Sequence, residues 1–166
     1  MNYDLPMLSL HPMTPKSFQR FLERSVTTYA AENVRSGRWT AEDAQERSAG
    51  EFRTLLPEGL ATPDNFCFDL HDADRHQDVG VLWYKLLQRG SQQIAFVYEI
   101  EVGAEHRRRG YAREAFRLLE HHAAERGATA VQLHVFGHNH SAQALYEGLG
   151  FEPVSITMQR ELKPLH

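Results

Sequence analysis

The sequence is poor in cysteine, in long apolar runs and in basic charge at its start, and each shortage excludes a class of protein. A single cysteine, Cys67, cannot form an internal disulfide, which is typical of a chain kept in a reducing cytoplasm. No stretch reaches the roughly 18 consecutive apolar residues that a membrane-spanning helix needs. The first residues lack the basic segment and apolar core of a signal peptide. We therefore expect a cytoplasmic protein without a membrane partner.

Basic residues are also too few overall for a dedicated nucleic-acid-binding domain. The net charge is −4 and the pI is about 6.2, whereas such domains usually carry a basic excess. The sequence has no G-x-G-x-x-G fingerprint of dinucleotide binding and no Walker phosphate loop. Any basic patch must therefore be local, and we expect no nucleic-acid partner.

Hydrophobic periodicity predicts one domain over residues 1–166, because no linker, repeat or low-complexity tract interrupts it. The predicted fold class is α/β, a mixed sheet that is antiparallel first and parallel later. The expected elements, in order, are a strand at 7–11, helices near 15–29 and 44–56, strands near 66–70, 79–87 and 93–102, a helix at 112–123, a strand at 131–135, a helix at 142–149 and a last strand on Val154, Ile156 and Met158.

The long strand near 93–102 places two carboxylates close together. Strict alternation predicts that Ile94, Phe96, Tyr98, Ile100 and Val102 share one face. The same alternation puts Ala95, Val97, Glu99 and Glu101 on the other face. Glu99 and Glu101 are thus expected side by side at the end of the strand, where mutual repulsion would raise one pKa.

Three arginines, Arg107 to Arg109, follow that strand and precede Gly110 and a predicted helix. The first amides of a helix lack internal partners, and the helix dipole favours an anion there. Glycine lets the backbone come close to a ligand, and arginine adds donors that match phosphate oxygens. The segment is therefore a candidate phosphate-binding loop, although a solvated turn explains these residues as well.

Three segments together resemble the GNAT superfamily of N-acetyltransferases. "RRRGYA" (107–112) fits the pattern [R/Q]-x-x-G-x-[G/A], "YEIEV" (98–102) precedes it, and "VFGHNHSAQALYEGLGFEP" (135–153) is similar to the second signature of the family. The resemblance covers roughly residues 79–162, and it departs from the commonest family form at Arg108 and Ala112, where glycine is frequent. It implies a GNAT fold, with helices on both faces of a central mixed sheet, and acetyl-CoA as cosubstrate.

The resemblance also implies which residues hold acetyl-CoA. The backbone amides of Ile100 and Val102 would bind the acetyl and pantetheine groups, in a strand that splays from its neighbour. Such donors would also stabilise the tetrahedral oxyanion. The loop would hold the pyrophosphate, and Asn139 would contact the cosubstrate or simply cap the following helix. The loop residues concerned are Arg107, Arg108, Arg109, Gly110, Tyr111 and Ala112.

Tyr146, Glu99 and Glu101 are the candidate catalytic residues. By the resemblance, Tyr146 protonates the departing sulfur, although it also fits an ordinary core position on its helix. A carboxylate must accept the proton of an ammonium acceptor, and we favour Glu99 over Glu101 because "YE" at this place resembles histone N-terminal acetyltransferases. Either carboxylate could instead bind a cationic substrate or face solvent.

The predicted function is transfer of an acetyl group to a primary amine, by direct attack in a ternary complex. The acceptor could be a small amine, a lysine or a peptide N-terminus. Two alternatives remain, a non-catalytic CoA-binding sensor or interaction module and, less favoured, a nucleic-acid contact through Arg107 to Arg109. The family makes a homodimer possible. The spacing of the histidines near the second signature does not guarantee the geometry of a zinc site, and no cysteine or H-E-x-x-H motif accompanies them, so we expect no metal.

Overall fold

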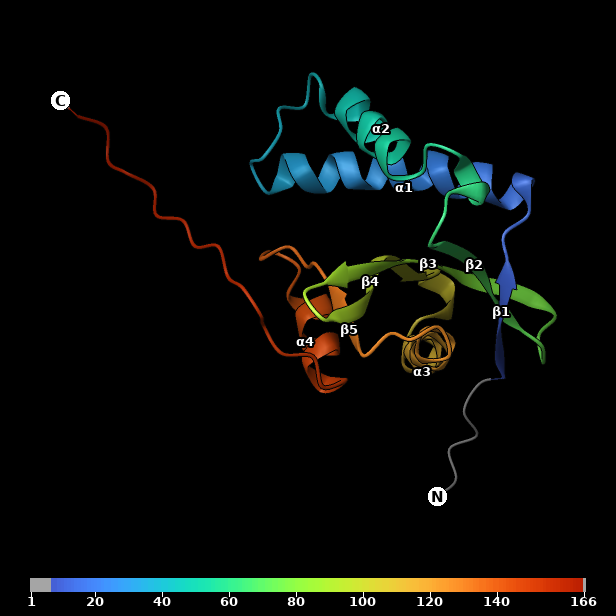
Figure 1. Ribbon diagram of the computed structural model, residues 1–166. Helices are drawn as coiled ribbons and strands as arrows, with labels where there is room; N and C mark the ends of the chain where they lie inside the picture. Colours follow the sequence, from blue (N-terminus) through green and yellow to red (C-terminus); the bar gives the residue numbers. More distant parts are fainter. Residues whose placement is uncertain (1–6, 166) are drawn as a thin grey trace.

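A computed structural model describes residues 7–165, and its centre is a five-stranded sheet (Figure 1). The strands lie side by side in chain order: β1 (Leu8–Pro12), β2 (Asn65–Asp72), β3 (Gln77–Arg89), β4 (Gln92–Val102) and β5 (Ala130–Leu133). Neighbours are antiparallel from β1 to β4, and β5 runs parallel to β4. The predicted mixed sheet, antiparallel first and parallel later, is confirmed.

Helices cover both faces of this sheet, as Figure 1 shows. Two lie together above it, α1 (Pro15–Arg35) and α2 (Ala44–Leu55), while α3 (Tyr111–Ala124) lies below it. The fourth, α4 (His140–Gly148), lies beside β5 on the side of α3. Two short 3₁₀ turns complete the described elements, η1 (Gly59–Ala61) and η2 (Ala104–His106). The sheet therefore separates an α1/α2 side from an α3/α4 side.

The N-terminus of α1 is fixed by a complete capping box. The Ser17 amide donates to Thr14 Oγ1 at 3.1 Å, and the Thr14 amide donates to Ser17 Oγ at 3.0 Å. Pro15 takes the first helical position, where its missing N–H costs no hydrogen bond. The predicted start of this helix is confirmed, and the amides of Thr14 and Ser17 are satisfied by the capping residues themselves.

Each face of the sheet carries its own hydrophobic core. On the α1/α2 side, Trp83 packs edge-to-face on Phe21 with ring centroids 6.1 Å apart. On the α3 side, residues of α3 pack on β2, β3 and β4, and the buried members include Leu70, Leu82, Tyr84, Ala95, Val97, Ala115 and Leu119. Because both faces of the sheet are covered, β3 is apolar along nearly its whole length.

A β-bulge interrupts β4 next to its two carboxylates. Trp83 pairs with Glu99 but Tyr84 pairs with Val97, so Tyr98 is one extra residue in the strand. Its ring stacks on Trp83 with centroids 4.4 Å apart, on the α1/α2 side. Val97 and Ile100 both pack into the core on the α3 side. The predicted alternation was therefore wrong: Ala95 and Val97 share a face with Ile100 and Val102, because the bulge reverses the parity.

The predicted last strand is absent from the structure. Residues 152–165, here named the C-terminal arm, form no helix or strand and extend away from the body (Figure 1). Val154, Ile156 and Met158 are 81%, 73% and 88% exposed. The alternating pattern is present, but a strand also needs a neighbour to hydrogen-bond with, and none of the described residues provides one.

Candidate active site

The candidate site is a gap between β4 and β5. The two strands pair only from Ile94 with Ala130 to Val97 with Leu133. Beyond Val97, at the bulge, β4 continues to Val102 with no strand beside it on that side among the described residues. The expected splaying of this strand is thus present in the structure, and it begins at Tyr98.

The backbone of β4 points two amides into this gap. The Gly103 amide donates to the Val79 carbonyl in β3 at 2.8 Å. Backbone N–H groups of a strand alternate in direction, so those of Ile100 and Val102 point the opposite way, towards the gap. They are free to bind a ligand there, because no strand pairs with them on that side in the described chain.

The segment between β4 and α3 has the backbone of an anion-binding loop. Arg108 and Gly110 have φ values of +61° and +82°, and no side chain caps the first turn of α3. Non-glycine residues seldom occupy this left-handed region, which suits the glycine that the family often has at position 108. Successive amides that turn inward in this way form a concavity for phosphate at the start of a helix.

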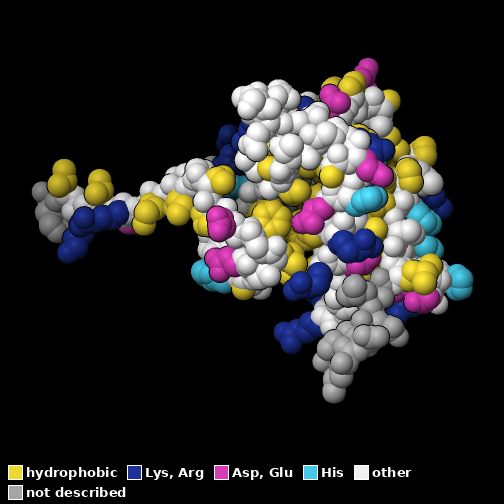
Figure 2. Space-filling view, turned by 60° about the horizontal axis from the view of Figure 1, so that its bottom comes forward, with side chains coloured by type: hydrophobic (Ala, Val, Ile, Leu, Met, Phe, Trp, Pro, Cys, Tyr) yellow, Lys and Arg dark blue, Asp and Glu magenta, His cyan; other side chains and the backbone are white. Residues whose placement is uncertain are grey.

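The three arginines are exposed around this loop, and one of them reaches back to the gap. Arg107 Nε donates to the Val102 carbonyl at 3.4 Å, which fixes that guanidinium at the mouth of the gap. On the face shown in Figure 2, hydrophobic side chains gather near the centre, with Lys, Arg, Asp and Glu side chains around them. Phosphate and apolar portions of one ligand could both be accommodated here.

Tyr111 anchors the loop instead of lining it. Its side chain is buried, and its hydroxyl donates to Asp72, which also accepts from the amides of Asp74 and Arg75. The Tyr111 hydrogen bond holds the pKa of Asp72 below its usual range. Of Tyr111, only the backbone amide at the first helical position can contact a ligand, and Ala112 follows it half-buried.

Glu99 lies half-buried on the α1/α2 side of β4, beside Cys67 and α1. Burial raises its pKa to about 7, Ser25 and Arg24 of α1 lower it, and the charge of Glu101 adds to the rise. A carboxyl with that pKa changes between acid and base near neutral pH. The same burial raises the pKa of the Cys67 thiol to about 12, so Cys67 is not a reactive thiolate.

Glu101 faces a cavity of about 390 Å³ between α1 and the ends of β3 and β4. Arg20 and Arg24, one helical turn apart on α1, line it together with Asp69 and His106. Neither arginine forms an ion pair within the described chain. Sequence reasoning missed this pair, although a spacing of four indicates one helix face.

Tyr146 lies in α4, on the other side of the sheet from α1 and α2 (Figure 1). Its ring packs edge-to-face on Phe116 of α3, at 5.9 Å, and on Phe151, at 5.8 Å. Burial raises the pKa of its hydroxyl, which keeps the phenol protonated. Glu99 and Tyr146 therefore stand on opposite faces, one on the α1/α2 side and one on the α3/α4 side.

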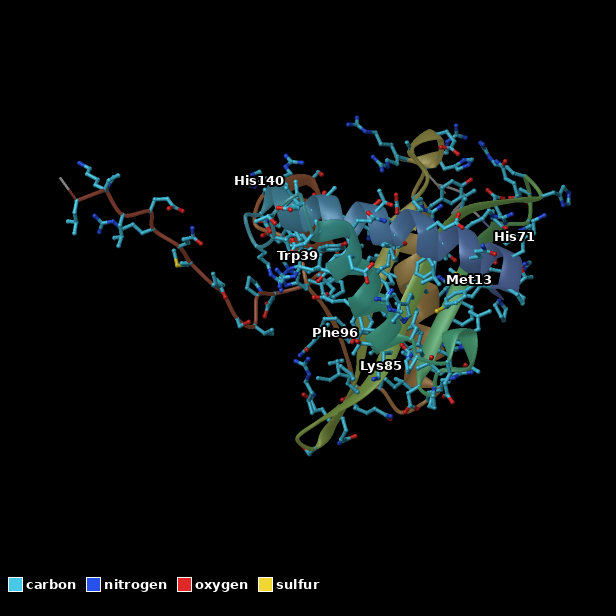
Figure 3. The ribbon with its side chains drawn as sticks, turned by 90° about the horizontal axis from the view of Figure 1, so that it is seen from above. Met13, Trp39, His71, Lys85, Phe96 and His140 are labelled. Carbon is cyan, nitrogen blue, oxygen red and sulfur yellow. The ribbon has the colours of Figure 1, made fainter. Side chains whose placement is uncertain are left out.

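Asn139 caps α4, as one reading of its sequence context predicted. Its side-chain oxygen accepts from the Ala142 amide at 3.2 Å, and the residue itself is exposed. The preceding His138 contacts the Glu32 carboxylate of α1, a link that the sequence did not indicate. Seen from above, Trp39 near the α1–α2 connection and His140 at the start of α4 lie at the same end (Figure 3).

Within residues 7–165 no group of three or more His, Cys, Asp or Glu side chains could hold a metal ion. No helix in that range is long and apolar enough to cross a membrane.

Comparison with known proteins gives a consistent result. Residues 27–151 match the Acetyltransferase (GNAT) family. The uncharacterized N-acetyltransferase YycN of Bacillus subtilis is 36% identical over 93% of this chain and 99% of its own length. Its crystal structure superposes with a TM-score of 0.89 at 35% identity, over 95% of this chain and all of that one. The uncharacterized N-acetyltransferase YdgE of the same species is 31% identical over 93% of this chain and 98% of its own.

A more distant relative has a more specific name. The mycothiol acetyltransferase of Kytococcus sedentarius is 31% identical over 78% of this chain, which corresponds to 40% of that longer protein.

Proposed function

Because the chain belongs to the GNAT acetyltransferase family, we propose that it transfers the acetyl group of acetyl-CoA to a primary amine, by direct attack in a ternary complex. The observation that carries this proposal is the gap between β4 and β5, with a candidate base on one face and a candidate acid on the other. In this proposal the amine enters on the α1/α2 side, and acetyl-CoA binds on the α3/α4 side.

In this proposal acetyl-CoA is held mainly by the backbone. The amides of Ile100 and Val102 hold the acetyl and pantetheine groups, and the loop from Arg107 through Arg108, Arg109, Gly110 and Tyr111 to Ala112 holds the pyrophosphate. Asn139 contacts the cosubstrate from the start of α4 while it caps that helix. Support comes from the two β4 amides left without a strand partner and from the uncapped start of α3.

Glu99 accepts the proton that the ammonium form of the acceptor must lose. The neutral amine then attacks the thioester carbon, a C–N bond forms, and the β4 amides stabilise the oxyanion. When the C–S bond breaks, the leaving thiolate takes a proton from the Tyr146 hydroxyl, and the second proton that the nitrogen loses as it becomes an amide restores the Tyr146 phenol through solvent. Glu101 lies nearer the cavity, where we assign it the attraction of the cationic acceptor.

The acceptor side favours an amine that also carries an acidic group. Arg20 and Arg24 offer two unpaired cations to a carboxylate, while Asp69 and Glu101 in the same cavity suit an ammonium group. The relative that is a mycothiol acetyltransferase supports screening small molecules before lysine-containing peptides and peptide N-termini. A cytoplasmic location, without nucleic-acid or membrane partners, belongs to the same proposal.

The first experiment is a thermal melt with and without acetyl-CoA. At about 100 times Kd, binding adds about 2.7 kcal/mol, or on the order of 5–10 °C for a domain of this size. No shift at millimolar acetyl-CoA would contradict the proposed site. A shift without turnover of any amine in a broad panel would instead favour the non-catalytic CoA-binding module.

A further inference from the structure

Helix α1 crosses the sheet above the gap between β4 and β5. In its first half, Phe21 packs edge-to-face on Trp83 of β3, with ring centroids 6.1 Å apart. One helical turn further on, Ser25 is buried and lies against Glu99 of β4. Near its end, the helix contacts the segment that links β5 to α4. Figure 3 shows this course from above. The part of β4 that has no strand beside it therefore lies under α1.

A single side-chain contact holds the far end of this crossing. His138 Nε2 and a carboxylate oxygen of Glu32 form a hydrogen bond, which becomes an ion pair when the imidazole is protonated. The two side chains are 21% and 32% exposed, so water screens their contact less than it screens one on the open surface. Within residues 7–165, no other hydrogen bond or ion pair joins α1 or α2 to the segment after β5.

A well-ordered turn presents His138 to α1. The Gln143 side chain donates to the carbonyls of Phe136 and Gly137, both at 3.0 Å, and the Asn139 amide donates to the Phe136 carbonyl at 3.0 Å. The His138 ring stacks on Phe136, with centroids 5.4 Å apart and planes 14° apart. The turn leads directly into α4. A contact that fixes His138 therefore also fixes the start of α4.

We propose that Glu32 and His138 form a clamp, named here the α1–α4 clamp, which holds the amine side and the cosubstrate side of the gap at a fixed separation. This inference rests on the proposed function. Direct attack requires reacting atoms about 3–3.5 Å apart, and a displacement of about 1 Å can cost about 100-fold in rate. The cavity for the amine lies against α1, whereas Tyr146 is carried by α4. Glu32 and His138 are thus positioning residues.

Glu32→Ala and His138→Phe each remove one half of the clamp, and the phenyl ring keeps the stacking on Phe136. We expect each variant to lower kcat by about tenfold, with Kd for acetyl-CoA within about twofold of the unaltered protein. The double variant should lose no more than either single variant, because both changes remove the same interaction. Glu23→Ala is the matched control and should keep full kcat. Glu23 is exposed on the same helix, and its carboxylate accepts from the Gln19 side chain.

Full kcat in both single variants, even with a lower Tm, would mean that the contact only stabilises the fold, which overturns the clamp. Losses that add in the double variant overturn it as well, because the two residues would then act separately.

Hydrogen exchange without acetyl-CoA gives a readout that needs no turnover. Amides of residues 26–35 and 138–143 should exchange faster in Glu32→Ala than in Glu23→Ala. Equal exchange in the two variants overturns the clamp. If the unaltered protein acetylates no amine, the proposed function fails, but faster exchange in Glu32→Ala still supports the clamp between α1 and α4.

Discussion

Two helices of this molecule begin in opposite ways. At α1, Thr14 and Ser17 cap each other's amides, and Pro15 removes one donor altogether. At α3, Gly110 takes a left-handed conformation, no side chain caps the first turn, and three exposed arginines precede it. Both starts have open amides in principle, but only α1 has a side-chain cap, which satisfies the amides of Thr14 and Ser17.

The difference distinguishes a helix start that stabilises the fold from a helix start that is available to a ligand. A capped start contributes stability and has nothing left to offer an anion. An uncapped start that is preceded by positive charge leaves its amides and its dipole for phosphate. The comparison therefore predicts that changes at α3 alter acetyl-CoA binding, while changes at α1 alter only the free energy of unfolding.

Gly110→Asp should have the largest effect on acetyl-CoA binding, because it gives α3 an acidic capping residue. The carboxylate would satisfy the open amides and repel the pyrophosphate, so the affinity for acetyl-CoA should fall by at least about 100-fold. Isothermal titration calorimetry measures the loss. Gly37→Asp is the matched control, because Gly37 has a φ of +80° with no atom within 4 Å of an added Cβ and lies away from the loop.

Both variants place an L residue in the left-handed region, so both should lose similar stability. Only Gly110→Asp should lose acetyl-CoA. Equal affinity in the two variants would mean that the arginine loop is a solvated turn.

Glu99→Gln tests whether the chemistry depends on the buried carboxylate on the far face from the loop. Below its pKa of about 7, Glu99 is protonated and cannot accept a proton, so kcat/KM of the unaltered protein should fall with each pH unit below neutrality. Glu99→Gln should lower kcat by about 100-fold and remove that acidic limb. A pH–rate profile measures both effects. The same acceptor amine is used for every variant, so its own ionisation contributes equally to each profile.

Glu101→Gln is the paired variant on the same face, two residues away. It should keep the acidic limb, with its midpoint lowered because a neighbouring negative charge is gone. If Glu101→Gln loses the limb and Glu99→Gln keeps it, the two assignments must be exchanged.

Much of this architecture could be predicted from the sequence, because periodicity and capping are local. Thr14-Pro15 marked the start of α1, and the order of the first four strands followed from alternation and turns. The bulge at Tyr98 could not be predicted, since one extra residue leaves no signature in a period of two. The prediction of a strand in the C-terminal arm failed for the opposite reason. The pattern of the arm is that of a strand, but pairing depends on a partner that the local sequence does not show.

The candidate site shows the same limit. The loop and Tyr146 came from short segments with a known resemblance, whereas Arg20, Arg24 and the Glu32–His138 contact join elements far apart in the chain. Spacing along α1 could have placed both arginines on one face. Nothing in the sequence could have placed that face over Glu101.

Tyr146→Phe extends the comparison to a third helix, α4. This helix is capped by Asn139, as α1 is capped by Thr14, and yet it carries a candidate catalytic group. The phenyl ring keeps the packing on Phe116 and Phe151 and removes only the proton donor. We expect kcat to fall by about tenfold or more while Kd for acetyl-CoA changes little. Unchanged turnover would assign the acid role to another group, and weaker acetyl-CoA binding would show that the hydroxyl contacts the cosubstrate.

Thr14→Ala should have the smallest effect, because it opens the start of α1 where no ligand binds. Loss of an N-cap side chain costs about 1 kcal/mol, or about 3 °C in Tm for a chain of this length. The Ser17 amide would lose Thr14 Oγ1 as its acceptor, whereas the Thr14 backbone amide would still donate to Ser17 Oγ, and Pro15 still occupies the position that needs no donor. Thermal unfolding measures the change, and calorimetry should find the same Kd for acetyl-CoA as in the unaltered protein. A weaker Kd in Thr14→Ala would mean that the α1 start supports the cosubstrate site as well, so that fold and ligand would not be divided between the two helices.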